Sequence, residues 1–137
     1  MLFAALGEAG RPEELPSLVL AYIGDAVYEL GVRAHLVQAG LVKVDKLHSE
    51  SVKYVNAGAQ AKIIKALEGI LTREEAAVAR RGRNAKTAHV PRSAGVIEYR
   101  HSTALESLIG YLYLKGDGDR LYQIITLALQ VVNENNR

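Results

Sequence analysis

Apolar residues recur at the spacing of an α-helix along almost the whole chain. In residues 17–38 they follow one another at intervals of three and four, and similar spacing returns in later stretches. No run alternates polar and apolar residues over the length that a strand needs. The sequence therefore predicts an all-α fold of five to seven helices.

Capping residues and glycines indicate where the first helices begin and end. The first helix is expected over residues 17–38, or from Leu15, with Gly40 as its stop. Asp45 is expected to cap a second long helix that carries apolar residues as far as Leu67.

The second half of the chain divides in the same way. Thr72 and Glu75 match a capping box, which predicts a short helix that ends near Gly82. Residues 82–93 are expected to form a loop. A further helix is expected over residues 102–114, with Ala94 as its earliest possible start. After a turn, residues 119–133 are expected to form the last helix. No repeat or linker interrupts the pattern, so we expect a single domain over residues 1–137 with its core in about residues 16–132.

Composition excludes several classes of protein. A chain of 137 residues with 49% apolar residues can bury its own core. The absence of cysteine excludes disulfide scaffolds, thiolate zinc sites and cysteine nucleophiles. No apolar run approaches the roughly 18 residues of a membrane span, and residues 1–10 lack the features of a signal peptide. We therefore expect a cytoplasmic protein without a membrane segment.

The net charge of +2 conceals a local excess of positive charge. Residues 79–101 contain six basic residues and one acid, a net of +5, whereas the remainder contains eleven basic and fourteen acidic residues, a net of −3. Such a local excess is typical of a surface that binds a polyanion such as nucleic acid. A solvated loop with incidental arginines explains the same charge.

Two carboxylates lie inside apolar helical stretches, each close to a glycine. Asp25 follows Gly24, and Glu106 has Gly110 one turn later on its own face. A glycine inside a helix costs about 1 kcal/mol relative to alanine, and close approach by another helix is one reason to keep it. If the two helices cross at these glycines, the two carboxylates converge.

Converging carboxylates suit Mg²⁺ or Mn²⁺, because Mg²⁺ commonly takes one or two protein carboxylates and completes its shell with water and phosphate. A metal held in this way can assist hydrolysis of a phosphodiester. The alternative is structural: Asp25 and Glu106 pair with arginines such as Arg33 or Arg100, and their spacing alone favours this interpretation.

Five segments resemble the ribonuclease III family. Residues 22–27 (Tyr-Ile-Gly-Asp-Ala-Val) resemble the family signature, and residues 105–114 (Leu-Glu-Ser-Leu-Ile-Gly-Tyr-Leu-Tyr-Leu) resemble its second acidic helix. Residues 47–57, 81–86 and 99–103 resemble Mini-ribonuclease III, the short bacterial form. The five motifs occur in the order of that family and cover nearly the whole chain, so the resemblance is specific.

The resemblance implies the ribonuclease III catalytic-domain fold and a Mg²⁺-dependent endoribonuclease for double-stranded RNA. Asp25 and Glu106 would bind the metal, with Mn²⁺ as a substitute, and position the hydrolytic water. The full-length enzymes have three further acids where this chain has Leu18, Ala21 and Thr103. The short form is similar in lacking them, so we expect fewer protein–metal bonds and more metal-bound water.

The resemblance also implies how the protein holds RNA and that two copies of the chain act together. We expect no double-stranded RNA-binding domain, so the catalytic domain itself is expected to hold the duplex, which proteins read mainly through phosphates and 2′-hydroxyls. The expected RNA contacts are Arg81, Arg83, Asn84 and Lys86. Lys53 and Lys62 are further candidates, although their recurrence along one helix is explained slightly better by a plain solvated face. The family implies a homodimer that cuts both strands with a two-nucleotide offset, leaving 5′-phosphates. Its cellular role is to trim the ends of the large-subunit (23S) ribosomal RNA precursor.

Two alternatives remain open. One is a catalytically degenerate ribonuclease III-like module that binds RNA or assists ribosome assembly, which the missing acids at Ala21 and Thr103 suggest. The other is a helical protein-interaction domain in which Asp25 and Glu106 are structural.

Overall fold

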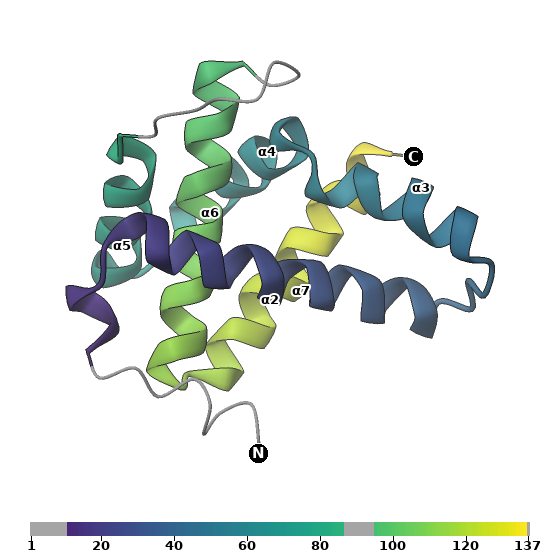
Figure 1. The fold of residues 1–137 in the computed structure, drawn as a ribbon, viewed down its shortest axis with the longest axis horizontal. Coiled ribbons are helices and arrows are strands. Elements are labelled where there is room, and N and C mark those ends of the chain that lie inside the picture. Colours follow the sequence, from purple (N-terminus) through teal and green to yellow (C-terminus); the bar gives the residue numbers. More distant parts are fainter. Residues whose placement is uncertain (1–10, 87–94, 137) are drawn as a thin grey trace.

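A computed structural model describes residues 11–86 and 95–136 (Figure 1). These residues form six α-helices and two single-turn 3-10 helices, with no strand among them. The elements are η1 (Pro12–Glu14), α2 (Ser17–Gln38), α3 (Val44–Val55), α4 (Ala57–Leu67), η2 (Glu68–Ile70), α5 (Arg73–Asn84), α6 (Val96–Lys115) and α7 (Gly118–Asn135). The predicted all-α fold is confirmed. Two predictions fall at least partly outside the described residues. They are the absence of a signal peptide, which concerns residues 1–10, and the loop, of which residues 87–94 are not described.

The prediction of one long second helix is wrong. The chain forms α3 and α4 instead, and they separate at Asn56, whose backbone is extended (φ −67°, ψ 156°). The Asn56 side chain caps α4 by accepting a hydrogen bond from the Ala59 N–H at 2.8 Å. Asp45, the predicted cap, lies in the first turn of α3, where Lys43 holds the capping position. The break allows α3 to contact α2 while α4 packs on α6 (Figure 1).

The other predicted boundaries agree with the structure to within a few residues. The capping box of α5 is confirmed: Thr72 accepts from the Glu75 N–H at 3.1 Å, and the Glu75 carboxylate accepts from the Thr72 N–H at 2.9 Å. The first helix ends as predicted. However, α5 continues past Gly82 to Asn84, so the start of the predicted loop is helical.

The central helix of the fold is α6, against which α2, α4, α5 and α7 all pack (Figure 1). Residues 102–112 are buried with one exception, Glu106, which is half-buried. A helix that is apolar on every side is typical of the centre of a helical protein. No helix in the described part of the chain is long and apolar enough to cross a membrane.

Candidate active site

Helices α2 and α6 cross in direct backbone contact at two glycines. A Cβ atom on Gly24 would overlap the backbone carbonyl of Glu106, and a Cβ atom on Gly110 would overlap the backbone carbonyl of Leu20. The close approach that the glycines predicted is therefore confirmed. Its consequence is that Asp25 and Glu106, about 80 residues apart in the sequence, lie on facing helices.

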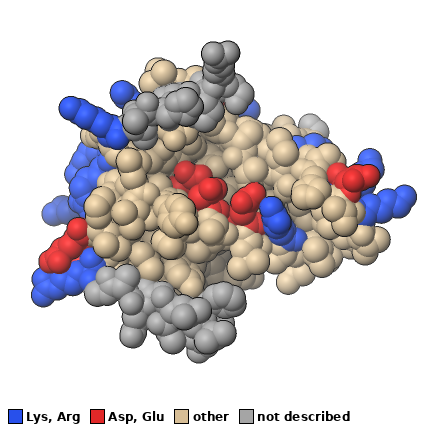
Figure 2. All heavy atoms as spheres, viewed as in Figure 1, with Lys and Arg blue, Asp and Glu red and all other residues tan. Residues whose placement is uncertain are grey.

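The crossing brings the two carboxylates into direct interaction. Asp25 is exposed and Glu106 is half-buried. Burial, followed by the negative charge of Asp25, raises the pKa of Glu106 to about 8. Glu29, one turn after Asp25, adds a smaller contribution of the same sign. Figure 2 shows acidic side chains gathered in a hollow near the middle of one face of the molecule.

Basic side chains do not neutralise this acidic pair within the described residues. Arg33 pairs with Glu29 at 3.5 Å instead of Asp25, and no salt bridge there involves Asp25, Glu106 or Arg100. The expectation that arginines neutralise the two acids is therefore wrong for the part of the chain that the structure describes. In this part of the chain no basic side chain compensates the repulsion between the two carboxylates, and without a cation a proton on Glu106 relieves it.

The acidic pair fits a divalent cation. Carboxylate oxygens are the ligands that Mg²⁺ and Mn²⁺ prefer, and two of them suffice when water and substrate phosphate complete the shell. A cation between Asp25 and Glu106 would replace their repulsion by attraction and displace the proton that Glu106 otherwise holds. Among residues 11–86 and 95–136, no group of three or more acids, histidines or cysteines is arranged to hold a metal by itself. The residues present therefore fit a metal that keeps much of its water.

Gln60 on α4 is a third side chain at the acidic pair, and the sequence analysis did not identify it. Its Nε2 atom donates to Glu106 Oε2 at 3.4 Å and to the backbone oxygen of Val55 at 2.9 Å. The side chain is 3% exposed. A sequence signal existed: Gln60 is a polar residue at the head of the apolar stripe that continues with Ile63, Ile64 and Leu67.

The residues predicted to contact RNA are exposed, and they lie on three helices. Arg81, Arg83 and Asn84 belong to the last turn of α5, and Lys86 follows it. Lys62 is exposed on α4. Lys53 lies in the last turn of α3, where it pairs with Glu50 at 3.0 Å. Figure 2 shows basic side chains mostly toward the two ends of the face, away from its acidic middle.

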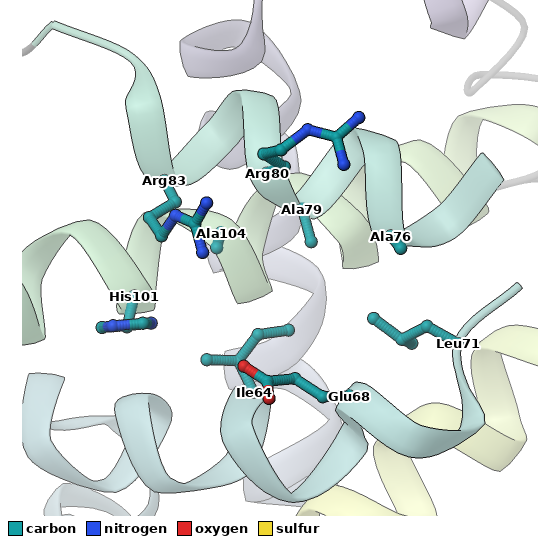
Figure 3. A pocket seen from close by; sticks show the side chains of 9 residues that line it. All are labelled: Ile64, Glu68, Leu71, Ala76, Ala79, Arg80, Arg83, His101 and Ala104. Carbon is teal, nitrogen blue, oxygen red and sulfur yellow. The ribbon is translucent and has the colours of Figure 1, made fainter. Parts of the chain in front are cut away.

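One of these residues, Arg83, lines a pocket of about 200 Å³ between α4, α5 and α6 (Figure 3). Arg80 and Arg83 from α5 and His101 from α6 surround it, together with Glu68 and an apolar floor. Burial, and then the positive charges of Lys65 and Arg83, lower the pKa of His101. Asp25 and Glu106 do not line this pocket, so the structure places Arg83 in a site separate from the acidic pair.

The comparisons with known proteins agree with this geometry. Residues 18–117 match the ribonuclease III domain family. The Mini-ribonuclease 3 of Symbiobacterium thermophilum is 47% identical over 89% of this chain and 94% of the relative, and that of Brevibacillus brevis is 48% identical over 84% and 86%. A crystal structure of a protein from Fusobacterium nucleatum has a TM-score of 0.77 and 34% identity, covering 85% of this chain and 93% of that one.

The all-α fold, with two acids meeting at a helix crossing, defines a ribonuclease III catalytic domain, a class of endoribonuclease that acts on double-stranded RNA. The resemblance seen in the five sequence motifs is confirmed. Within that class, the chain belongs to the Mini-ribonuclease 3 family.

Proposed function

We propose that the protein cleaves both strands of an RNA duplex with a divalent metal, Mg²⁺ or Mn²⁺, held by Asp25 and Glu106. The supporting observation is that two carboxylates converge at the glycine crossing of α2 and α6, where no basic side chain of the described residues forms a salt bridge with them. Two carboxylates that are held together although they repel each other are typical of a functional site.

The two acids have different tasks in this proposal. Glu106, half-buried and held by Gln60, is the fixed ligand, whereas Asp25 is exposed where a substrate phosphate can approach. A bound divalent metal supplies a water nucleophile at neutral pH and stabilises the charge that develops on the leaving oxygen. Because no third acid in the described part of the chain is arranged with Asp25 and Glu106 to hold a metal, water and phosphate would complete the shell of the cation.

We assign the RNA contacts to the basic residues at the end of α5. Arg81, Arg83 and Lys86 would contact phosphates, and Asn84 would hydrogen-bond sugar or phosphate, because all four are exposed. Lys62 on α4 and Lys53 on α3 are further candidates on other helices, and Lys53 would exchange Glu50 for phosphate. The local charge of +5 in residues 79–101 supports this assignment.

We further infer that two copies of the chain form a homodimer through α2. Large apolar side chains on this helix are exposed, among them Leu18 (43%), Val19 (43%), Tyr22 (80%) and Leu30 (62%). An exposed apolar stripe of this kind is typical of a protein–protein interface. Because the stripe belongs to the helix that carries Asp25, a second copy would bring two sites close together, one for each strand.

The decisive experiment is cleavage of an end-labelled RNA duplex, with and without Mg²⁺, beside the same strand unpaired. The unmodified protein should cut only the duplex and only with metal. Asp25→Asn and Glu106→Gln should lose cleavage by at least about 100-fold while binding the duplex, because each keeps the shape of the acid and removes its charge. Asp45→Asn, which changes an exposed acid on α3, is the matched control and should cut normally.

The same experiment separates the alternatives. Retained cutting by Asp25→Asn contradicts the proposal. Binding without cutting under every condition favours the degenerate RNA-binding or ribosome-assembly module, and neither binding nor cutting favours a protein-interaction domain.

The cellular substrate belongs to the same proposal. We infer that the protein acts in the cytoplasm on the stem that joins the ends of the 23S ribosomal RNA precursor. Incubation with that stem should release products with 5′-phosphates and two-nucleotide 3′ overhangs, which end mapping detects. A duplex of equal length and unrelated sequence measures how far the enzyme prefers this stem.

A further inference from the structure

Gln60 combines burial with an unused hydrogen-bond acceptor beside the acidic pair. The residue is 3% exposed, yet its Oε1 atom has no hydrogen-bond partner among residues 11–86 and 95–136. Leaving a buried acceptor without a partner costs about 1–3 kcal/mol. A group that supplies a donor to this atom would therefore be stabilised there.

The orientation of the Gln60 amide follows from its other contact. Nε2 donates to the backbone oxygen of Val55 at 2.9 Å, and turning the amide over would place Oε1 against that carbonyl oxygen. Nε2 therefore stays toward Glu106, to which it donates at 3.4 Å. Val55 ends α3 immediately before the break at Asn56, so the α3–α4 junction holds the amide in place.

In the described part of the chain, Gln60 is the side chain that donates a hydrogen bond to Glu106, whereas Asp25 accepts one from Glu106 when Glu106 is protonated. The Gln60 amide therefore contacts the Glu106 carboxylate from a third helix, α4. Groups that orient a metal ligand in this way commonly change metal affinity or activity by about 10–100-fold when they are removed.

We propose that Gln60 is a positioning residue, which holds the Glu106 carboxylate toward Asp25 for metal binding and offers Oε1 as acceptor to a water molecule of the metal. This inference rests on the proposed metal-dependent function. It adds a third helix, α4, to a site that the sequence motifs assign to α2 and α6 alone.

The test compares Mn²⁺ binding, measured by calorimetry, in the unmodified protein, in Gln60→Met and in Gln130→Met. Methionine has a volume similar to that of glutamine but lacks the amide group. Gln130, an exposed glutamine on α7, serves as the matched control. We expect Gln60→Met to weaken Mn²⁺ binding about 10–100-fold and to lower kcat with little change in the KM for duplex RNA. Gln130→Met should change neither quantity. A folded Gln60→Met variant with unchanged Mn²⁺ affinity overturns the proposal.

A measurement on the unmodified protein does not depend on whether the variant folds. The side-chain amide protons of Gln60 should shift in NMR spectra during a Mg²⁺ titration, in step with metal binding. Signals that stay in place while the metal binds overturn the positioning role. Mn²⁺ binding that requires Asp25 but is insensitive to Gln60 overturns this inference alone, whereas absence of Mn²⁺ binding in the unmodified protein overturns the proposed function as well.

Discussion

Glu106 is the residue whose chemistry depends most on its surroundings. Burial and the charge of Asp25 raise its pKa to about 8, and the amide of Gln60 partly opposes that shift. The folded protein therefore holds a proton on Glu106 more tightly than the unfolded chain does, from the ordinary value of 4.5 up to about 8. In the absence of metal, the free energy of unfolding should fall as the pH rises through this window, because the folded state alone must give up that proton.

We expect Glu106→Gln to remove this pH dependence. At about pH 9 and without metal, the variant should be more stable than the unmodified protein by about 1–2 kcal/mol, because the neutral amide avoids a buried, repelled charge. Urea unfolding across the pH range measures the difference, with Glu134→Gln, an exposed acid on α7, as the control. A Glu106→Gln variant that is less stable than the unmodified protein at alkaline pH would show that the repulsion is already relieved.

At the scale of elements, the contact of α2 with α6 decides whether a site exists. Gly24 and Gly110 allow the two backbones to touch, and the acids meet only because they do. A local glycine cost of about 1 kcal/mol in each helix is offset by burial of the central helix. Small residues at such a crossing therefore belong to the function as much as to the packing.

Gly24→Ala should destabilise the protein severely, by about 4 kcal/mol or more, since the new Cβ meets a backbone carbonyl that no side-chain rotation can move. Thermal and urea unfolding measure the loss. Gly69→Ala is the control, because a Cβ there meets nothing within 4 Å, and it should change stability by no more than about 0.5 kcal/mol. Equal stability of the two variants would mean that the helices can move apart freely.

At the scale of the whole molecule, charge is distributed unevenly, and the basic end of α5 should dominate RNA affinity. A triple variant, Arg81→Gln with Arg83→Gln and Lys86→Gln, should weaken duplex binding. It should also reduce the slope of log affinity against log salt by up to about one unit per lost phosphate contact. Binding titrations at several salt concentrations measure both effects.

The matched control changes three exposed basic residues away from the C-terminal end of α5, Lys43, Lys46 and Arg73, to glutamine; Arg73 lies at the opposite end of that helix. It carries the same change in net charge and should lose much less affinity. Equal losses in both triple variants would mean that the overall charge, rather than the α5 surface, attracts RNA.

The proposed dimer is also a property of the whole molecule. Tyr22→Asp places a charge in the exposed apolar stripe of α2 and should convert a dimer to a monomer, because the interface would have to bury an unpaired charge. Sedimentation velocity measures the change. Tyr122→Asp, at a tyrosine on α7 that is 76% exposed, should leave the dimer intact. A monomeric unmodified protein at working concentration would contradict the interface.

The sequence by itself determined the helical class and most helix ends, whereas the meeting of Asp25 with Glu106 was only one of two interpretations until the structure showed the crossing. Helix propensity, capping and apolar periodicity act over a few residues, so a single segment shows them. The glycines next to the acids are a local sign that another helix approaches closely. Only the tertiary structure placed Gln60 beside Glu106, put Arg83 in a pocket away from the acids and left Tyr22 exposed. It also showed the break at Asn56, where extended backbone overrides a continuous helical pattern. These features depend on how α2, α4, α5 and α6 pack across long stretches of sequence. A single segment can mark a residue as unusual, as it does for Gln60, but it does not name the residue's partner.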